Sequence, residues 1–202
     1  MRFLTSVSLV SLVLLVLLTL VAGPVAAGPL DMAGAPQAMV CSACHGFGGQ
    51  SQSNTMPILA GIAPWYFKKA IADYAAGKRT SPEMEPYAKM VMQFGVDDIA
   101  AYFAAQQRTA SPVKLDAAAV ERGKAAAAQC TVCHGVSGKG DASKGVPDLT
   151  GQPPGYLRNQ MLLFKADRRS PGDDTLKAVK ALMKTIPDEQ FADLAAYWSS
   201  VR

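Results

Sequence analysis

Cys41-Ser42-Ala43-Cys44-His45-Gly46 is the stretch that decides the fold, and Cys130-Thr131-Val132-Cys133-His134-Gly135 repeats it later in the chain. Together the two copies contain all four cysteines and both histidines of the sequence. Two thiols three positions apart can reach the two vinyl groups of one porphyrin, and the adjacent imidazole then falls beneath the iron. The repeat therefore predicts two covalently attached haem c groups. The thioethers would come from Cys41, Cys44, Cys130 and Cys133, and the proximal iron ligands would be His45 and His134.

Two other kinds of site also use a Cys-x-x-Cys pattern, namely redox dithiols and zinc sites. A redox dithiol does not explain why a histidine directly follows the second cysteine in both copies. A structural zinc site built from both halves would use the four cysteines and leave both histidines unexplained. Haem attachment accounts for all six residues, so it is the interpretation adopted here.

Length and composition bound the class of protein. The chain has 202 residues, enough for one or two compact domains. Half of the residues are hydrophobic but only 7% are aromatic, which suits small helical domains whose cofactor supplies much of the core. The net charge is +4, and the basic residues are scattered without a stripe or an aromatic platform. We therefore expect no nucleic-acid partner.

The N-terminus resembles an export signal. A single positive charge at Arg2 precedes a long apolar run from Phe3 to Ala22, and Val25-Ala26-Ala27 offers a small-x-small cleavage site. This pattern predicts a signal peptide over residues 1–27. The alternative is an uncleaved membrane anchor, because the apolar run is about long enough to span a bilayer. Both interpretations export the remainder, so we expect a periplasmic protein, tethered to the membrane if the segment is retained.

The chain contains an internal duplication. The haem motifs are 89 residues apart (41 to 130), and Pro57-Ile58-Leu59-Ala60-Gly61 returns 90 residues later as Pro147-Asp148-Leu149-Thr150-Gly151. Three single residues also return after 90 residues: Tyr66 as Tyr156, Tyr74 as Phe164, and Arg79 as Arg169. Near the end, Ala100-Ala101-Tyr102-Phe103 returns 95 residues later as Ala195-Ala196-Tyr197-Trp198.

No strand-like alternation appears, so the predicted fold class is all-α, with two tandem cytochrome c domains each wrapped around one haem. The predicted domains are residues 28–108 and 116–202, joined by a linker over 109–115. Pro64 and Gly77 bound one predicted helix, with Phe67, Ile71 and Tyr74 on its buried face. Further helices are expected over 97–107, after a cap at Asp116, and over 187–200.

The whole exported part resembles the dihaem cytochromes of the cytochrome c4 type, a family of periplasmic electron carriers built from two cytochrome c domains. Such proteins carry the sixth iron ligand in a loop before the last helix, in a run similar to Met-x-Pro-x-Ala. Here that run is Met84-Glu85-Pro86-Tyr87-Ala88, so the resemblance implies Met84 as the distal ligand of the first haem. For Met90 and Met92 we expect apolar packing.

The resemblance implies supporting roles as well. Pro57 and Pro147 stand where the family places a proline whose carbonyl accepts the imidazole N–H, although each also suits a plain turn. The arginines at 79, 168 and 169 either neutralise haem propionates or are solvated. Tyr66, Tyr156 and Trp198 are expected in the core.

The second half departs from the family pattern. An offset of 90 carries Met84 onto Asp174 and an offset of 95 carries it onto Val179, and no methionine lies between these positions. Met183, one helical turn after Val179, is the tentative replacement ligand, with plain core packing as its alternative role. Lys177, Lys180 or Lys184 could supply an amine instead, or the iron could stay five-coordinate. Met161 is expected in the core.

These residues favour electron transfer over catalysis. The chain shows no acid–base dyad, nucleophile–base pair or phosphate loop, so we expect a carrier without its own substrate turnover. Its partners would be redox proteins, a dehydrogenase on one side and an oxidase or reductase on the other. The first alternative is a cytochrome subunit of a larger oxidoreductase, of the flavocytochrome c sulfide dehydrogenase kind. The second is a redox enzyme or small-ligand binder, if the second iron is open.

Overall fold

The computed structural model describes residues 28–170 and 173–202. The predicted signal peptide lies outside these residues. Within them the regular structure is helical, and the only strand-like features are two isolated bridges. The predicted all-α class is therefore confirmed. None of the described helices is long and apolar enough to cross a membrane.

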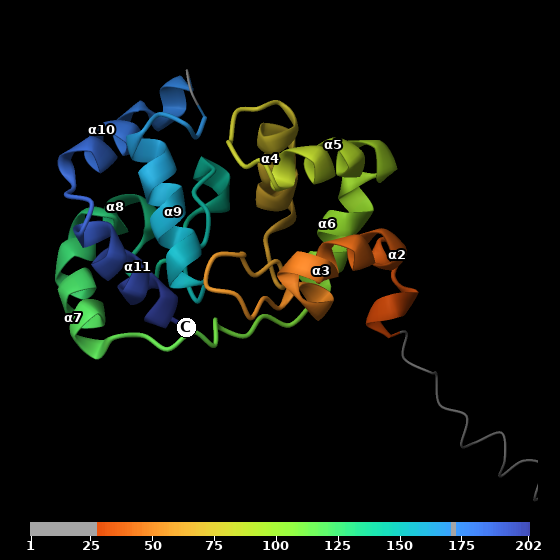
Figure 1. The fold of residues 1–202 in the computed structure, drawn as a ribbon, viewed down its shortest axis with the longest axis horizontal. Helices are drawn as coiled ribbons and strands as arrows, with labels where there is room; N and C mark the ends of the chain where they lie inside the picture. Colours follow the sequence, from red (N-terminus) through yellow and green to blue (C-terminus); the bar gives the residue numbers. More distant parts are fainter. Residues whose placement is uncertain (1–27, 171–172) are drawn as a thin grey trace, which may run out of the picture.

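The helices form two halves, which occupy the right and left sides of Figure 1. The first half contains α2 (Ala35–Ala38), α3 (Ser42–His45), α4 (Pro64–Ala75), α5 (Met84–Phe94) and α6 (Val96–Ala105), with short 3-10 turns at Pro29–Asp31, Met39–Cys41 and Phe47–Gly49. The second half contains α7 (Ala117–Ala126), α8 (Thr131–His134), α9 (Pro154–Lys165), α10 (Lys177–Thr185) and α11 (Gln190–Ser200), with turns at Ala127–Gln129, Ala142–Lys144 and Asp174–Leu176. The extended segment that joins them runs along the lower edge in Figure 1.

Local sequence signals set most helix boundaries. Helix α4 begins at Pro64 and stops before Gly77, whose φ of 67° suits a glycine. Its predicted buried face, formed by Phe67, Ile71 and Tyr74, is buried in the structure. Helix α7 begins after Asp116, whose side chain accepts a hydrogen bond from the amide of Ala118. Helix α11 begins at Gln190, three residues later than predicted, and α6 ends two residues earlier.

Each half closes where its N-terminal segment crosses its last helix. Gly34 lies directly against the backbone carbonyl of Asp98 in α6, and a Cβ atom at this position would overlap that carbonyl. Gly123 of α7 meets the carbonyl of Asp193 in α11 in the same way. The glycines are 89 residues apart (34 to 123), like the haem motifs. Only a residue without a side chain permits this approach, so both crossings depend on glycine.

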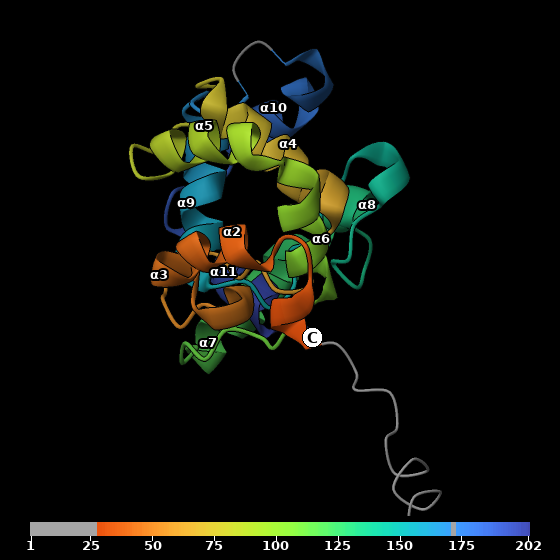
Figure 2. The ribbon, with the colours of Figure 1, turned by 90° about the vertical axis from the view of Figure 1, so that its right-hand side faces the viewer.

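Two separate hydrophobic cores lie behind these crossings. The first is built from α2, α4, α5 and α6, and its largest fully buried side chains are Tyr102, Phe103 and Ile99. The second is built mainly from α9, α10 and α11, around Trp198, Phe191 and Leu194. Figure 2 shows the two halves end-on, with the first half in front of the second. Each haem motif therefore sits on a core of its own.

We expect Gly123→Ala to destabilise the second half by about 1–3 kcal/mol, because the new methyl group forces α7 away from α11. Chemical denaturation followed by circular dichroism would measure the loss. The exposed neighbour Lys124→Ala is the matched control and should change stability by no more than about 0.5 kcal/mol. Equal stability of the two variants would contradict this account of the crossing.

Candidate haem sites

Both motif histidines are oriented by the same hydrogen bond. His45, at the end of α3, is 4% exposed, and its Nδ1 lies 2.8 Å from the carbonyl oxygen of Pro57. His134, at the end of α8, has its Nδ1 2.9 Å from the carbonyl oxygen of Pro147. A carbonyl can only accept, so Nδ1 donates in each pair and Nε2 keeps its lone pair. The expected role of the two prolines is therefore observed, and each imidazole is prepared to bind a metal through Nε2.

Burial also keeps these imidazoles neutral. It lowers the pKa of His45 and of His134 below the usual value for histidine, while the bond to the proline carbonyl acts in the opposite direction and is the smaller effect. Neutral imidazole is the form that ligates metal ions. Both side chains are thus in the required state near neutral pH.

The motif cysteines lie on the same short helical turns as the histidines. No disulfide joins any of the four, all of which the structure describes. Burial raises the pKa of the Cys41 thiol to about 11. Among the described residues, no three or more histidine, cysteine or acidic side chains gather at one point, which argues against a zinc site shared by the two motifs.

One continuous cavity of about 1860 Å³ reaches both motifs. Its volume exceeds the roughly 300–1,000 Å³ of a typical small-molecule site. The six motif residues all line it: Cys41, Cys44, His45, Cys130, Cys133 and His134. The lining is largely apolar elsewhere, as a porphyrin requires. The cavity therefore brings together the two sets of residues that the repeated motif predicts.

Met84 faces this cavity in the first half. It is the first residue of α5, is partly buried against the first core, and lines the cavity. The sequence placed it in a loop, whereas the structure places it at a helix N-terminus. Met90 also lines the cavity. Met92 does not pack as expected, because its side chain points outward and the residue is 49% exposed.

In the second half, a methionine and not a lysine reaches the cavity from α10. Met183 is 9% exposed, belongs to the second core and lines the cavity. Lys177 forms a surface ion pair with Asp174. Lys180 is buried, but its Nζ donates to the carbonyl oxygen of Ser170 at 2.5 Å. Lys184 is exposed, and none of the three lysines lines the cavity.

Two arginines bridge the halves in a reciprocal arrangement. Arg79 of the first half donates from Nη2 to the hydroxyl of Tyr156 at 2.8 Å, and Arg169 of the second half donates to the hydroxyl of Tyr66 at 2.9 Å. Both also donate to Oε1 of Gln160, at 2.7 Å and 3.0 Å respectively. The arginines and the tyrosines are each 90 residues apart, so the interface follows the duplication. The tyrosines, expected in the core, pack against the edges of the two cores and also take part in this interface.

This interface carries positive charge without a matching carboxylate. Arg79 is only 2% exposed, yet neither Arg79 nor Arg169 takes part in a salt bridge among the described residues. Burial alone would raise the pKa of Tyr66, but the two guanidinium groups lower it. A buried cation with no anion is costly, and both arginines line the cavity. Haem propionates would supply the missing negative charge. Of the three arginines, only Arg168 is exposed, so it alone suits the alternative role of a solvated surface residue.

A buried donor in the cavity wall also lacks a partner. Nε1 of Trp65 is buried and makes no hydrogen bond among the described residues, although the residue lines the cavity. A buried indole N–H normally finds an acceptor. Together with the arginines, this donor shows that the residues present fit a group that is apolar over most of its surface and carries carboxylates.

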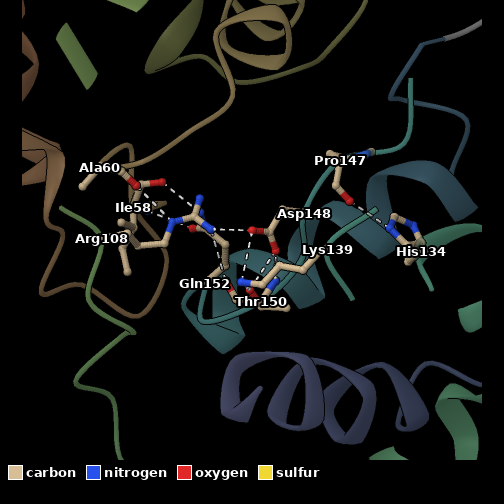
Figure 3. A network of polar contacts seen from close by, with 9 residues as sticks. All are labelled: Ile58, Ala60, Arg108, His134, Lys139, Pro147, Asp148, Thr150 and Gln152. Atoms are coloured by element: carbon tan, nitrogen blue, oxygen red, sulfur yellow. Dashed lines mark hydrogen bonds and ion pairs between the residues drawn. The ribbon is translucent and has the colours of Figure 1, made fainter. Parts of the chain in front are cut away.

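A second bridge between the halves lies beside the proximal side of the second site (Figure 3). The side-chain NH₂ of Gln152 donates to the backbone carbonyl of Ile58 at 2.8 Å, and the side-chain oxygen of Gln152 accepts from the backbone N–H of Ile58 at 2.9 Å. Arg108 donates to the carbonyl of Ala60 at 3.0 Å and to Asp148 at 3.1 Å, next to Pro147. No sequence signal marks Gln152 as a contact residue. For Arg108 the sequence predicts only that it is the last residue of the first domain.

The comparisons with known proteins agree with this site. A family model described as Cytochrome c matches residues 120–202. Cytochrome c4 of Pseudomonas aeruginosa is 37% identical over 172 residues, which cover 82% of this chain and 85% of that protein. The chain belongs to the cytochrome c4 family. A crystal structure of reduced cytochrome c4 from Pseudomonas stutzeri matches this c4-type chain with a TM-score of 0.75 at 28% identity, covering 84% of this chain and 97% of the other.

Another relative carries a more specific name. The "thiosulfate dehydrogenase electron acceptor" of Stutzerimonas stutzeri is 28% identical over 177 residues, which cover 82% of this chain and 81% of that protein. This c4-type cytochrome is thus built from two tandem cytochrome c domains, as predicted, and is an electron-transfer protein of the kind that binds haem c covalently.

We expect Arg79→Gln to lower the reduction potential of the holoprotein by on the order of tens of millivolts, because loss of a buried positive charge favours the oxidised iron. A redox titration followed by absorption spectroscopy would measure the change. Arg158→Gln removes an equal charge from an exposed position that does not line the cavity, and it should leave the potentials unaltered within error. A similar response of the two variants would contradict the placement of Arg79 beside the cofactor.

Proposed function

We propose that this c4-type cytochrome is an exported dihaem protein that carries electrons between redox partner proteins in the periplasm, with one haem c on each motif. The observation that carries the proposal is the shared cavity. Both motif histidines line it, and the Nδ1 of each makes the same kind of hydrogen bond to a proline carbonyl. When bound, haem supplies a one-electron Fe(III)/Fe(II) couple. The N-terminal segment 1–27, with its cleavage pattern, supports export.

The proposed roles of the site residues follow from their positions. The residues that would hold the porphyrins through thioethers are Cys41, Cys44, Cys130 and Cys133, and His45 and His134 would ligate the iron from one side. Met84 would supply the second iron ligand in the first site, and Met183 would supply it in the second. The domains are residues 28–108 and 116–202, with 109–115 as the linker. The carbonyls of Pro57 and Pro147 hold the proximal rings in place, so that oxidation and reduction require little movement of the protein.

The contacts between the halves fix the two sites relative to each other. The reciprocal Arg79–Tyr156 and Arg169–Tyr66 bonds tie α4 and the loop after it to α9 and the loop after it. Gln152 and Arg108 add a second set of bonds nearby. Because one continuous cavity reaches both motifs, two haems held there would lie without a wall of protein between them, an arrangement that would favour electron exchange between the two sites.

The haem content tests the proposal directly. The protein would be expressed with its signal segment in a host that attaches haem c, and its mass and pyridine haemochrome spectrum would be measured. We expect two haems per chain and a titration with two one-electron steps. A mass with one porphyrin or none, under conditions that mature a control cytochrome, would overturn the dihaem assignment.

We expect Met84→Ala to abolish the sulfur-to-iron charge-transfer band of the first haem and to lower its potential, because thioether ligation raises the potential. Optical spectra of the oxidised protein and a redox titration would measure both effects. Met92→Ala is the matched control, since this methionine is 49% exposed and should leave spectrum and potential unchanged. An unaltered spectrum in Met84→Ala would rule out this residue as ligand.

A second candidate function is that of a dedicated acceptor subunit for one dehydrogenase. The relative named as a thiosulfate dehydrogenase electron acceptor supports this second candidate. A purified thiosulfate dehydrogenase, given thiosulfate, should then reduce the protein faster than it reduces an unrelated c-type cytochrome at equal concentration. Equal rates would favour the general carrier. Co-purification with a flavoprotein would instead point to the sulfide-oxidising flavocytochrome arrangement.

A further inference from the structure

The second half lacks a sulfur ligand at the position that corresponds to Met84. Buried residues in and next to the last two helices of each half coincide at an offset of 95: Ile99 of α6 matches Leu194 of α11, and Val91 of α5 matches Ile186, the residue directly after α10. In this register Met84 corresponds to Val179. Val179 lines the cavity and packs against the second core from its edge, as Met84 does in the first half. Its aliphatic side chain contains no atom that could bind iron.

Met183 occupies a different place on the helix. It is the seventh of the nine residues of α10, and in the same register it corresponds to the fully buried Ala88. Four residues displace it by about 6 Å along the helix axis from the position of Val179. Its side chain already has a packed position, in a core cluster that includes Phe191 and Leu194. The unbranched thioether can move between such a position and the cavity at little cost.

No other described residue of this wall offers a better ligand. Lys177, Lys180 and Lys184 do not line the cavity. The hydroxyl of Thr175 donates to Asp173 at 2.6 Å. Asp173 also lines the cavity, but its carboxylate accepts hydrogen bonds from the amide and the hydroxyl of Thr175. Apart from Met183, the lining residues that follow are aliphatic: Leu176, Ala178, Val179 and Leu182. This surface disfavours an anion, because burying an unpaired charge is costly, whereas a small neutral molecule loses nothing there.

We propose that the sixth position of the second haem site is exchangeable and binds a small neutral ligand of the carbon monoxide or nitric oxide class. Met183 holds this position loosely and returns to its place in the second core when the ligand enters. The first site, closed by Met84, does not bind such ligands. The inference rests on the proposed dihaem function and makes the two sites chemically different.

Carbon monoxide titration of the reduced holoprotein, followed by absorption spectroscopy, tests this proposal. We expect one of the two haems to bind carbon monoxide. The change in Soret absorption should then be about half of that seen for a control in which every haem binds it. Binding to neither haem would overturn the proposal, and so would binding to both. The haem count is measured first on the same sample. A chain with fewer than two haems refutes the proposed function, whereas two haems without carbon monoxide binding refute only this inference.

Two variants locate the exchangeable position. Val179→Met restores a thioether at the position that corresponds to Met84 and should weaken carbon monoxide binding at least tenfold. Met84→Ala should open the first site and raise the stoichiometry from one to two. Unchanged binding in Val179→Met, with both haems still present, would show that Val179 does not face the iron and would overturn the proposal.

The role of Met183 has its own readout. Met183→Leu keeps the core packed but removes the competing sulfur, so the affinity for carbon monoxide should rise severalfold and the oxidised spectrum should gain high-spin character. Met161→Leu, the other cavity-lining methionine of the second half, is the control and should change neither property. If Met183→Leu behaves like this control, Met183 is not the displaced ligand.

Discussion

The hydrogen bond from each imidazole Nδ1 to a proline carbonyl is the constraint on which the rest of the molecule depends. It connects a residue at the end of a very short helix to a loop twelve or thirteen residues further on, at His45–Pro57 and His134–Pro147. The bond turns Nε2 toward the cavity and fixes the tautomer. Because this bond already orients the imidazole, the surrounding helices need only enclose the site, and one small hydrophobic core in each half is enough to hold them in place.

The sequence predicted what depends on local pattern and missed what depends on contacts between the halves. The helical class, the α4 stripe and the Asp116 cap follow from spacing or capping chemistry, and the structure agrees with them. The haem motifs also follow from spacing, and the structure places their residues along one cavity. The interface was not predicted, because no periodicity reports that Gln152 will meet Ile58 or that Arg79 will meet Tyr156. The roles of these side chains depend on contacts between the two halves, which the structure shows and the sequence pattern does not.

The duplicated halves differ at several positions beside the cofactor sites and beside each other. Trp65 of the first half corresponds to Gly155 in the second, and a Cβ atom at Gly155 would approach the carbonyl oxygen of Asn54 to 2.8 Å. A tryptophan there is therefore excluded by the neighbouring half. On the distal side, Met84 and Ala88 are replaced by Val179 and Met183. Two copies of one scaffold thus present unequal surroundings to two chemically identical groups.

The uncompensated guanidinium groups at the interface have a consequence for how the protein matures. Without propionates, docking of the halves would bury Arg79 among neutral partners, at a cost of several kcal/mol. Before haem is attached, the Arg79 contacts should therefore contribute less to the docking of the halves than they do in the loaded protein, whereas the bonds of Gln152 and Arg108 join the halves at no such cost.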